Sequence, residues 1–351
     1  MRALPQYRVE QHAADAVRDS VIAFWSRVHF NPLNGQVDAR SRYDWLYLRC
    51  PEGPGRMYLL LDAHGSIIGC LGAVNRCFMQ GSRRLRGSIL TDFFVDPLHR
   101  FAFPAMLLQR EARRGELQQC DIVVGLPGQK AQQLFKRLGA DRIFAAHSFV
   151  KILNWRHITH RYLPKAVGGV AGVALNGVDW LAGAVQTLTS CARGTWSCGP
   201  EETAEALEQI WDRSTTGIHV VGVRNACYLK WRFQQCPQLA PRLFIVRKRR
   251  GTEPLGYFVC SVERDGIDIH DFHFVDTDRW FCAGLRQLVR AARALERPRM
   301  SVELVVTPTL RRQLSRLHFS LRRSRSVFVL LGTAAPPDCD HLEFTHADCD
   351  V

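Results

Sequence analysis

The stretch Leu90-Thr91-Asp92-Phe93-Phe94-Val95-Asp96-Pro97-Leu98-His99-Arg100 decides the fold. It continues a strand expected from Arg83 to Val95, which ends at Asp96-Pro97. A helix is expected from Phe103 to Leu117, with Pro104 in the first turn, where a missing N–H group is tolerated. The stretch therefore predicts a strand that leads through a short loop into the N-terminus of a helix.

The elements expected around this stretch form a mixed α/β unit. Helices are expected over 14–27 and 43–48, because apolar residues in the first recur with a period near 3.6. Strands over 57–62, 67–75 and 83–95 form an antiparallel meander, and the elements 103–117, 121–126, 130–138 and 142–153 then alternate between helix and strand. This order predicts a mixed sheet with helices on both faces.

The second half of the chain repeats this order. Helices are expected over 201–210, 228–233, 281–295 and 309–317, and strands over 241–247, 255–263, 267–275, 300–306 and 326–331. The chain is therefore predicted to hold two copies of one α/β unit, at roughly 10–155 and 200–335, that share topology more than sequence.

Length and composition agree with two folded domains. The chain has 351 residues, 46% hydrophobic and 23% charged, which excludes a largely disordered protein. The formal net charge is +14, but only six of the 47 basic residues are lysine and the arginines are dispersed. We interpret most of this charge as solvated arginine-rich surface, while an RNA or an anionic membrane remains an alternative partner.

The 12 cysteines include no Cys-x-x-Cys pair and show no zinc-ligand spacing, so no metal is expected. Residues 1–10 carry charges and no apolar core, unlike a secretory signal. We therefore expect reduced thiols and a cytoplasmic location.

The segment 166–188 is rich in Gly, Ala and Val. Asp179 and several glycines argue against a membrane span, because charge is costly at the centre of a bilayer. We expect a hydrophobic helical linker over 158–199 between domains at 1–157 and 200–351. Peripheral membrane contact through 166–188 is the alternative.

The stretch around Asp92 resembles the central strand and following loop of the GNAT acyltransferase superfamily. In that family a strand ending in Val-x-Pro is followed after two residues by Arg or Gln, here Arg100. Further similarity lies in Gly125-Leu126-Pro127 and Leu138-Gly139-Ala140, and, in the second half, in Trp231-Arg232-Phe233 and Leu317-His318-Phe319. The resemblance covers most of the chain and implies a tandem GNAT protein related to the Fem-type aminoacyl transferases.

The resemblance implies that the first copy binds acetyl-CoA or another acyl-CoA. The free N–H groups of a helix N-terminus bind phosphate, and in the family this site holds the pyrophosphate of coenzyme A. Here the loop has no glycine, which normally lets backbone approach a phosphate. The expected donor-binding residues are Phe94, Val95, Arg100, Phe101, Ala102, Phe103 and Ala105. In the second copy, Asp276 and Asp278 would repel phosphate.

Acyl transfer to an amine needs a base and an acid for the leaving thiolate. Asp92 on the central strand is the candidate base, and a structural hydrogen bond is its alternative role. The family's usual acid is a tyrosine, but the matching residue here is Phe135, which has no hydroxyl. His99 beside the loop is the candidate substitute.

The acceptor site is expected in the cleft between the copies. Its candidate residues are the aromatic and charged side chains that the family places on the substrate side: Tyr43, Trp45, Tyr228, Trp231, Arg232 and Asp271. Core packing is the alternative for the aromatic side chains.

The sequence thus predicts a cytoplasmic N-acyltransferase that moves an acyl group from acyl-CoA to an amine. An amino sugar or amino-acyl compound in cell-surface polysaccharide or peptide assembly is the expected acceptor. The alternatives are a Fem-type enzyme that uses aminoacyl-tRNA, and a non-catalytic binding module that keeps the fold.

Overall fold

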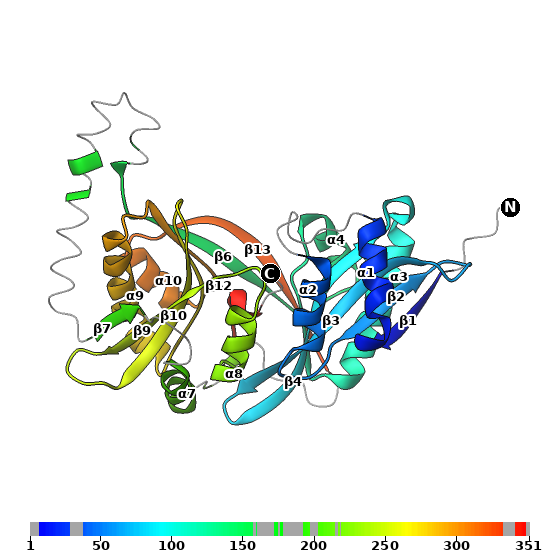
Figure 1. The fold of residues 1–351 in the computed structure, drawn as a ribbon, viewed down its shortest axis with the longest axis horizontal. Coiled ribbons are helices and arrows are strands. Elements are labelled where there is room, and N and C mark those ends of the chain that lie inside the picture. Colours follow the sequence, from blue (N-terminus) through cyan, green and yellow to red (C-terminus); the bar gives the residue numbers. More distant parts are fainter. Residues whose placement is uncertain are drawn as a thin grey trace.

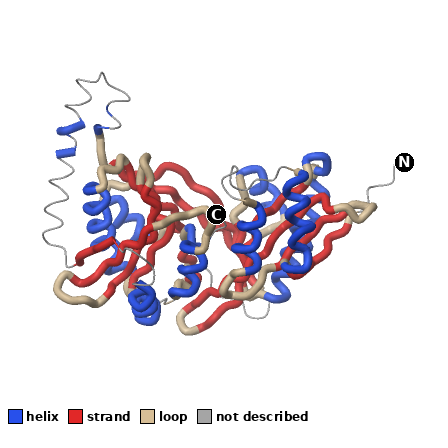
Figure 2. Tube along the Cα trace, in the orientation of Figure 1, coloured by secondary structure: helices blue, strands red, loops and turns tan. Residues whose placement is uncertain are grey.

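In a computed structural model, the protein is two α/β lobes that share one sheet (Figures 1 and 2). The structure describes residues 7–28, 38–156, 159, 172–174, 176–177, 192–196, 203–214, 217, 219–332 and 341–348. The predicted boundaries at 157 and 200, and most of the expected linker, lie outside these residues. Within that linker, Ala192–Trp196 forms a strand of the sheet and not the expected helix.

The first lobe begins with a strand that the sequence reading missed, β1 (Arg8–Ala13). The elements after it are η1 (Asp15–Val17), α1 (Arg18–Arg27), α2 (Ala39–Tyr43), the π-helical turn η2 (Asp44–Leu48), β2 (Arg56–Leu61), β3 (Ile67–Gln80), β4 (Arg83–Val95), η3 (Pro97–His99), α3 (Ala102–Gln119), β5 (Ile122–Gly125), α4 (Gln129–Arg137) and β6 (Arg142–Ile152). This order matches the predicted one, and only β3 and α1 differ by more than two residues at an end.

The second lobe repeats the pattern and adds short strands that the sequence reading missed. Its described elements are β7 (Ala192–Trp196), α7 (Ala204–Arg213), β8 (Val220–Gly222), α8 (Ala226–Leu229), the π-helical turn η5 (Lys230–Gln234), β9 (Arg242–Lys248), β10 (Pro254–Val262), β11 (Ile267–Phe274), α9 (Thr277–Ala294), β12 (Arg299–Val305), α10 (Pro308–Arg316), β13 (Ser320–Leu331), β14 (Leu342–Glu343) and η6 (His346–Asp348). The missed strands have two to six residues, too few for a period-2 pattern to stand out.

The last long strand of each copy pairs with the other copy. The sheet order is β1-β2-β3-β4-β5-β13-β6-β12-β11-β10-β9-β7, with β8 beside β3 and β14. Strand β13 pairs with β5 of the first lobe, β6 pairs with β12 of the second, and the two lie side by side in the middle (Figure 1). Counted inward from either edge, five strands of one copy are followed by the last long strand of the other copy. Each lobe is therefore completed by the other.

A parallel strand pair lies at the same place in each lobe, β4 with β5 and β11 with β12, and the short strands β8 and β14 are also parallel. Helix α3 covers one face of the first lobe, and α9 and α10 cover the second lobe over its largest apolar cluster. On the opposite face, α1, α2 and η2 share a single core with α7, α8 and η5. A common core joins the lobes in addition to the exchanged strands.

The exchange predicts that neither half folds alone. A fragment of residues 1–157 lacks β13, so the inner edge of β5 has unpaired backbone groups and an exposed apolar face. We expect this fragment to aggregate or to show no cooperative urea unfolding by circular dichroism. Co-expression with residues 158–351 should restore a soluble complex. A monomeric fragment with a sharp unfolding transition would contradict the exchange.

Candidate functional site

The central strand of the first lobe is bulged at Asp92. Cys70 pairs with Phe94 and Gly72 with Thr91, so two residues of β4, Asp92 and Phe93, lie opposite one residue of β3. Asp92 has a φ of 49°, in the left-handed region that Asp tolerates better than most residues. Bulges are common beside active sites, where they redirect a side chain.

The bulge holds the Asp92 carboxylate between two donors. Arg42 Nη2 donates to Oδ1 at 2.8 Å and Tyr47 OH donates to Oδ2 at 2.7 Å. The side chains of Arg42 and Asp92 are each 2% exposed. Burial raises the pKa of Tyr47 well above its ordinary value, and the charge on Asp92 raises it further, so the phenol stays protonated and donates. The geometry shows the structural hydrogen bond; catalysis by Asp92 stays a prediction.

Tyr47 reaches Asp92 only because residue 72 is glycine. A Cβ atom at Gly72 would lie 2.0 Å from the Tyr47 hydroxyl oxygen. A larger residue at this position would displace the phenol from the carboxylate.

The predicted donor loop leads from β4 to an uncapped helix. Asp96 caps η3 by accepting from the Leu98 N–H group, and α3 then begins at Ala102 with Phe101 at its N-cap and no side-chain cap. Arg100 donates from Nε to the carbonyl of Val95 at 2.8 Å, and its guanidinium lies 4.7 Å from the centre of the Phe94 ring. The first turn of α3 therefore offers N–H groups and a positive dipole end next to an arginine.

The matching helix of the second lobe differs at its N-terminus. Helices α3 and α9 both have 18 residues, but Asp276 caps α9 by accepting from the Arg279 N–H group, and Asp278 adds a second carboxylate. An anion would be repelled there. The absence of phosphate binding in the second copy stays a prediction.

Apolar side chains surround the start of α3. Leu98 is 83% exposed, Phe103 61% and Phe101 51%. Tyr7, which the sequence reading missed, packs its ring near His99, Phe101 and Phe103, and its hydroxyl lies 3.3 Å from His99 Nδ1. Ala105 is half-buried in the first turn, and Val95 is buried at the end of β4.

The predicted acceptor aromatics lie in the core that joins the lobes. Trp45 in η2 and Trp231 in η5 stack with ring centres 5.3 Å apart. Each indole N–H group donates to the backbone carbonyl of the other tryptophan, at 2.8 and 2.9 Å. This reciprocal pair joins the first copy to the second. The role that the structure shows for both tryptophans is therefore packing and hydrogen bonding.

The other acceptor candidates are also buried. Tyr43 donates its hydroxyl to the carbonyl of Ala14, and Tyr228 donates to Ala347, with burial raising the pKa of Tyr228 to about 12. Arg232 donates to the carbonyls of His346 and Ala347. Contact of these residues with a substrate stays a prediction.

Asp271 belongs to a buried charge network that crosses between the lobes. It accepts from Arg224 at 3.0 Å, Tyr257 at 2.9 Å and Thr345 at 2.6 Å. Arg224 also binds Asp348, which Arg76 of β3 binds from the first lobe at 2.8 Å. Through these ion pairs of Asp348, segment 341–348 is attached to both lobes.

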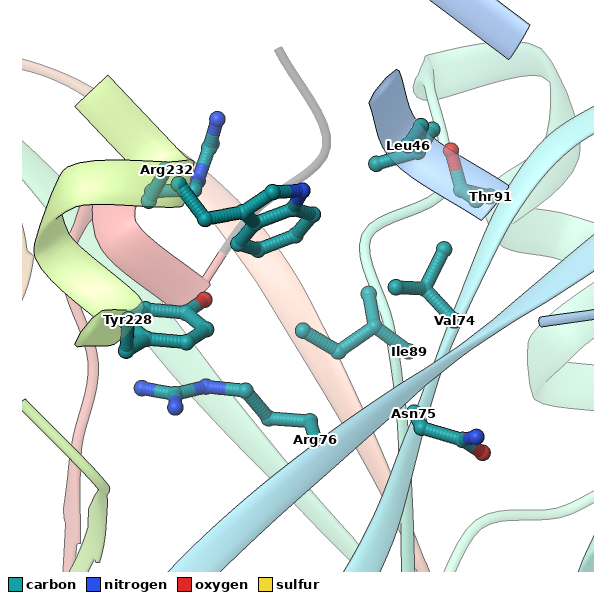
Figure 3. A pocket seen from close by; sticks show the side chains of 9 residues that line it. Leu46, Val74, Asn75, Arg76, Ile89, Thr91, Tyr228 and Arg232 are labelled. Atoms are coloured by element: carbon teal, nitrogen blue, oxygen red, sulfur yellow. The ribbon is translucent and has the colours of Figure 1, made fainter. Parts of the chain in front are cut away.

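A small cavity lies where the lobes meet (Figure 3). Val74, Ile89 and Thr91 of the first lobe face Tyr228 and Arg232 of the second, and Arg76 lies 3.7 Å from the centre of the Tyr228 ring. The cavity volume is about 10 Å³, enough for about one water molecule. In this conformation the cavity has no room for a sugar or a peptide.

Three histidines in the second lobe lie in surroundings that disfavour their charged form. Burial lowers the pKa of His270 to about 4 and the pKa values of His273 and His346 to about 3. All three are therefore neutral at pH 7.

Within the described residues, no cluster of His, Cys, Asp and Glu is arranged to hold a metal ion. No helix in that part of the chain is both long and apolar enough to cross a membrane. The segment 166–188 lies almost entirely outside it.

No protein-family model and no curated protein sequence matches the chain. Solved structures do match. A GCN5-related N-acetyltransferase from Anabaena variabilis has a TM-score of 0.59 at 13% identity, covering 93% of this chain and 73% of that one. An N-myristoyltransferase from Saccharomyces cerevisiae with bound myristoyl-CoA has a TM-score of 0.53 at 10% identity, covering 96% and 85%.

A tandem GNAT protein from the clavulanic acid biosynthesis pathway has a TM-score of 0.51 at 12% identity, covering 94% of this chain and all of that one. These likenesses show the fold. The chain has the mixed α/β tandem GNAT fold that the stretch around Asp92 predicted.

We expect removal of the Asp92 carboxylate to destabilise the folded protein. Asp92→Ala removes the carboxylate from a buried ion pair with Arg42 and should lower the free energy of unfolding by about 3–5 kcal/mol. The matched control, Glu253→Ala, breaks ion pairs whose side chains are at least 40% exposed and should cost at most about 1 kcal/mol. Urea unfolding measures both, and equal losses would contradict a buried, structurally required carboxylate.

Because these three histidines are neutral in the folded protein, we expect the protein to lose stability in mild acid. Below pH 6.5 the unfolded chain binds protons that His270, His273 and His346 do not bind in the folded state, so the free energy of unfolding falls as pH falls. Urea midpoints at pH 7, 6 and 5 should decrease in that order, and His273→Leu should reduce the slope. A flat profile over this range would contradict the prediction.

Proposed function

We propose that the protein is an N-acyltransferase that takes its acyl group from acyl-CoA bound to the first lobe. The observation that carries this proposal is the uncapped N-terminus of α3, next to Arg100 and directly after the bulged strand β4. Its support from the comparisons is that the fold is shared with N-acyltransferases, one of them solved with myristoyl-CoA.

The residues of the loop fit the phosphates of the donor in part. The N–H groups of Ala102 and Phe103 would bind the pyrophosphate, and Arg100 would add positive charge. Pro104 supplies no N–H group, and the loop has no glycine that would let its backbone approach a phosphate closely. The exposed rings of Phe101 and Phe103 would instead cover the apolar part of the donor.

The thioester would lie where β4 and β5 part. Their parallel pairing ends at Leu90 and Gly125, and the bulge follows at once on β4. In a bulge, the N–H group of the extra residue is not hydrogen-bonded to the neighbouring strand. Such an N–H group would polarise the thioester carbonyl.

In the proposed reaction the amine nitrogen attacks the thioester carbon, the carbon–sulfur bond breaks, and the thiolate takes a proton. Asp92 would accept the proton of the amine on a lone pair that Arg42 and Tyr47 leave free, since a carboxylate has about four acceptor sites. His99, at the same end of β4, would protonate the thiolate. Both roles are part of the proposal.

For the acceptor we propose an amino sugar or amino-acyl compound used in cell-surface polysaccharide or peptide assembly, with the reaction taking place in the cytoplasm. Because the small cavity between the lobes holds about one water, the acceptor would bind after Trp231 and Arg232 move apart from β3 and β4. The Fem-type alternative would show as tRNA binding that weakens steeply with salt, together with no binding of CoA.

Calorimetry with acetyl-CoA and longer acyl-CoAs tests the donor site. We expect Arg100→Ala to weaken binding about tenfold, which is ~1.4 kcal/mol, because it removes the cation beside the helix N-terminus. Arg290→Ala, an exposed arginine on α9, is the matched control and should bind as the unchanged protein does.

Release of free thiol in the presence of an amine panel then tests catalysis. No binding heat at any chain length would overturn the proposed donor. Binding without thiol release for any amine would favour the non-catalytic alternative.

A further inference from the structure

A polar groove lies in the second lobe, on the sheet face opposite to α9 and α10. Its volume is about 440 Å³, within the range of small-molecule sites. Its lining residues come from strands β11, β12, β6 and β13, which lie in the second lobe and at its junction with the first, and from His346 of η6. None of the residues proposed above to bind the donor lines it.

Two β-bulges converge on this groove. Val259 pairs with Asp271 and Cys260 with Ile269, so His270 is the extra residue of β11. Leu321 pairs with Phe149 and Arg323 with Ser148, so Arg322 is the extra residue of β13. Because of the second bulge, two consecutive arginines line one groove, although successive residues of a regular strand face opposite sides.

The charges around the groove are predominantly positive. The two acidic residues that line it are already paired, Asp268 with Arg299 and Glu303 with Arg325. Arg323 approaches Glu303 only to 3.7 Å and is 80% exposed. Arg322 has no ion pair with another residue of the described part of the chain. The Arg322 guanidinium therefore remains available at the rim, and that of Arg323 is held by its longer ion pair with Glu303.

The side of the groove offers neutral hydrogen-bonding groups. His270 Nε2 lies 2.6 Å from Ser261 Oγ, and the His270 and His346 rings meet edge to face at 5.6 Å. Both imidazoles are neutral at pH 7, and because Ser261 already engages Nε2 of His270, its Nδ1 atom is the ring nitrogen left for a ligand. Neutral donors beside two arginines suit an anion, since guanidinium groups bind phosphate and carboxylate oxygens in pairs.

We propose that this groove is a second ligand site, which binds the phosphate or carboxylate group of a small polar molecule between Arg322, Arg323 and the imidazole of His270. The site is separate from the donor loop of the first lobe and does not depend on the proposed acyl transfer.

Calorimetry with glucose 6-phosphate, glucuronate and glucose tests the proposal. We expect at least one of the two charged probes to bind at least tenfold more tightly than glucose, and the tighter one identifies phosphate or carboxylate as the preferred group. The double variant Arg322→Ala/Arg323→Ala should weaken that binding at least tenfold. Arg250→Ala, an exposed arginine in the β9–β10 turn, is the matched control and should leave it unchanged.

Nuclear magnetic resonance of the histidine side chains then locates the site. The charged probe should shift the His270 imidazole signals in the unchanged protein but not in the double variant. Equal binding of glucose and the charged probes, or full binding by the double variant, would overturn the proposal. Binding that is lost with Arg100→Ala instead would place the probe at the donor loop, which overturns the second site and leaves the proposed donor site intact.

Discussion

The exchange of β6 and β13 is the constraint on which the rest of the molecule depends. Because each strand completes the sheet of the other copy, the two lobes are held in one register along the whole length of the sheet. That register brings η2 opposite η5, where the two tryptophans exchange hydrogen bonds, and brings Arg76 within reach of Asp348. The shared core and the buried charge network both follow from this arrangement.

The two lobes have the same topology but have diverged where chemistry would take place. Helix α3 has a free N-terminus beside Arg100, whereas α9 is capped and acidic. The bulge of β4 carries a carboxylate sealed by Arg42 and Tyr47, whereas the bulge of β11 carries an imidazole beside an open groove. The pseudosymmetric fold thus presents a different face to ligands in each lobe.

The sequence predicted much of the fold, because its long strands and helices have clear periodicity and because the segment from Asp92 to Arg100 has a recognisable order. It could not predict the exchange, because nothing in the local sequence of β6 or β13 indicates which strand will pair with it. It also could not separate packing from binding for Trp45 and Trp231, because both roles use the same residue type. The groove went unnoticed because His270 and Arg322 come together only through bulges, which leave little trace in a hydrophobic pattern.

The exchanged strand also sets the order in which the protein can be completed during synthesis. Gly125 of β5 pairs with Phe328 of β13, so β5 has emerged from the ribosome long before its partner exists. At translation rates of about 5–20 residues per second, its inner edge stays open for roughly 10–40 seconds. An unpaired apolar strand is a template for aggregation during that interval. Two independently closed domains would not leave such an edge open after synthesis of the first domain.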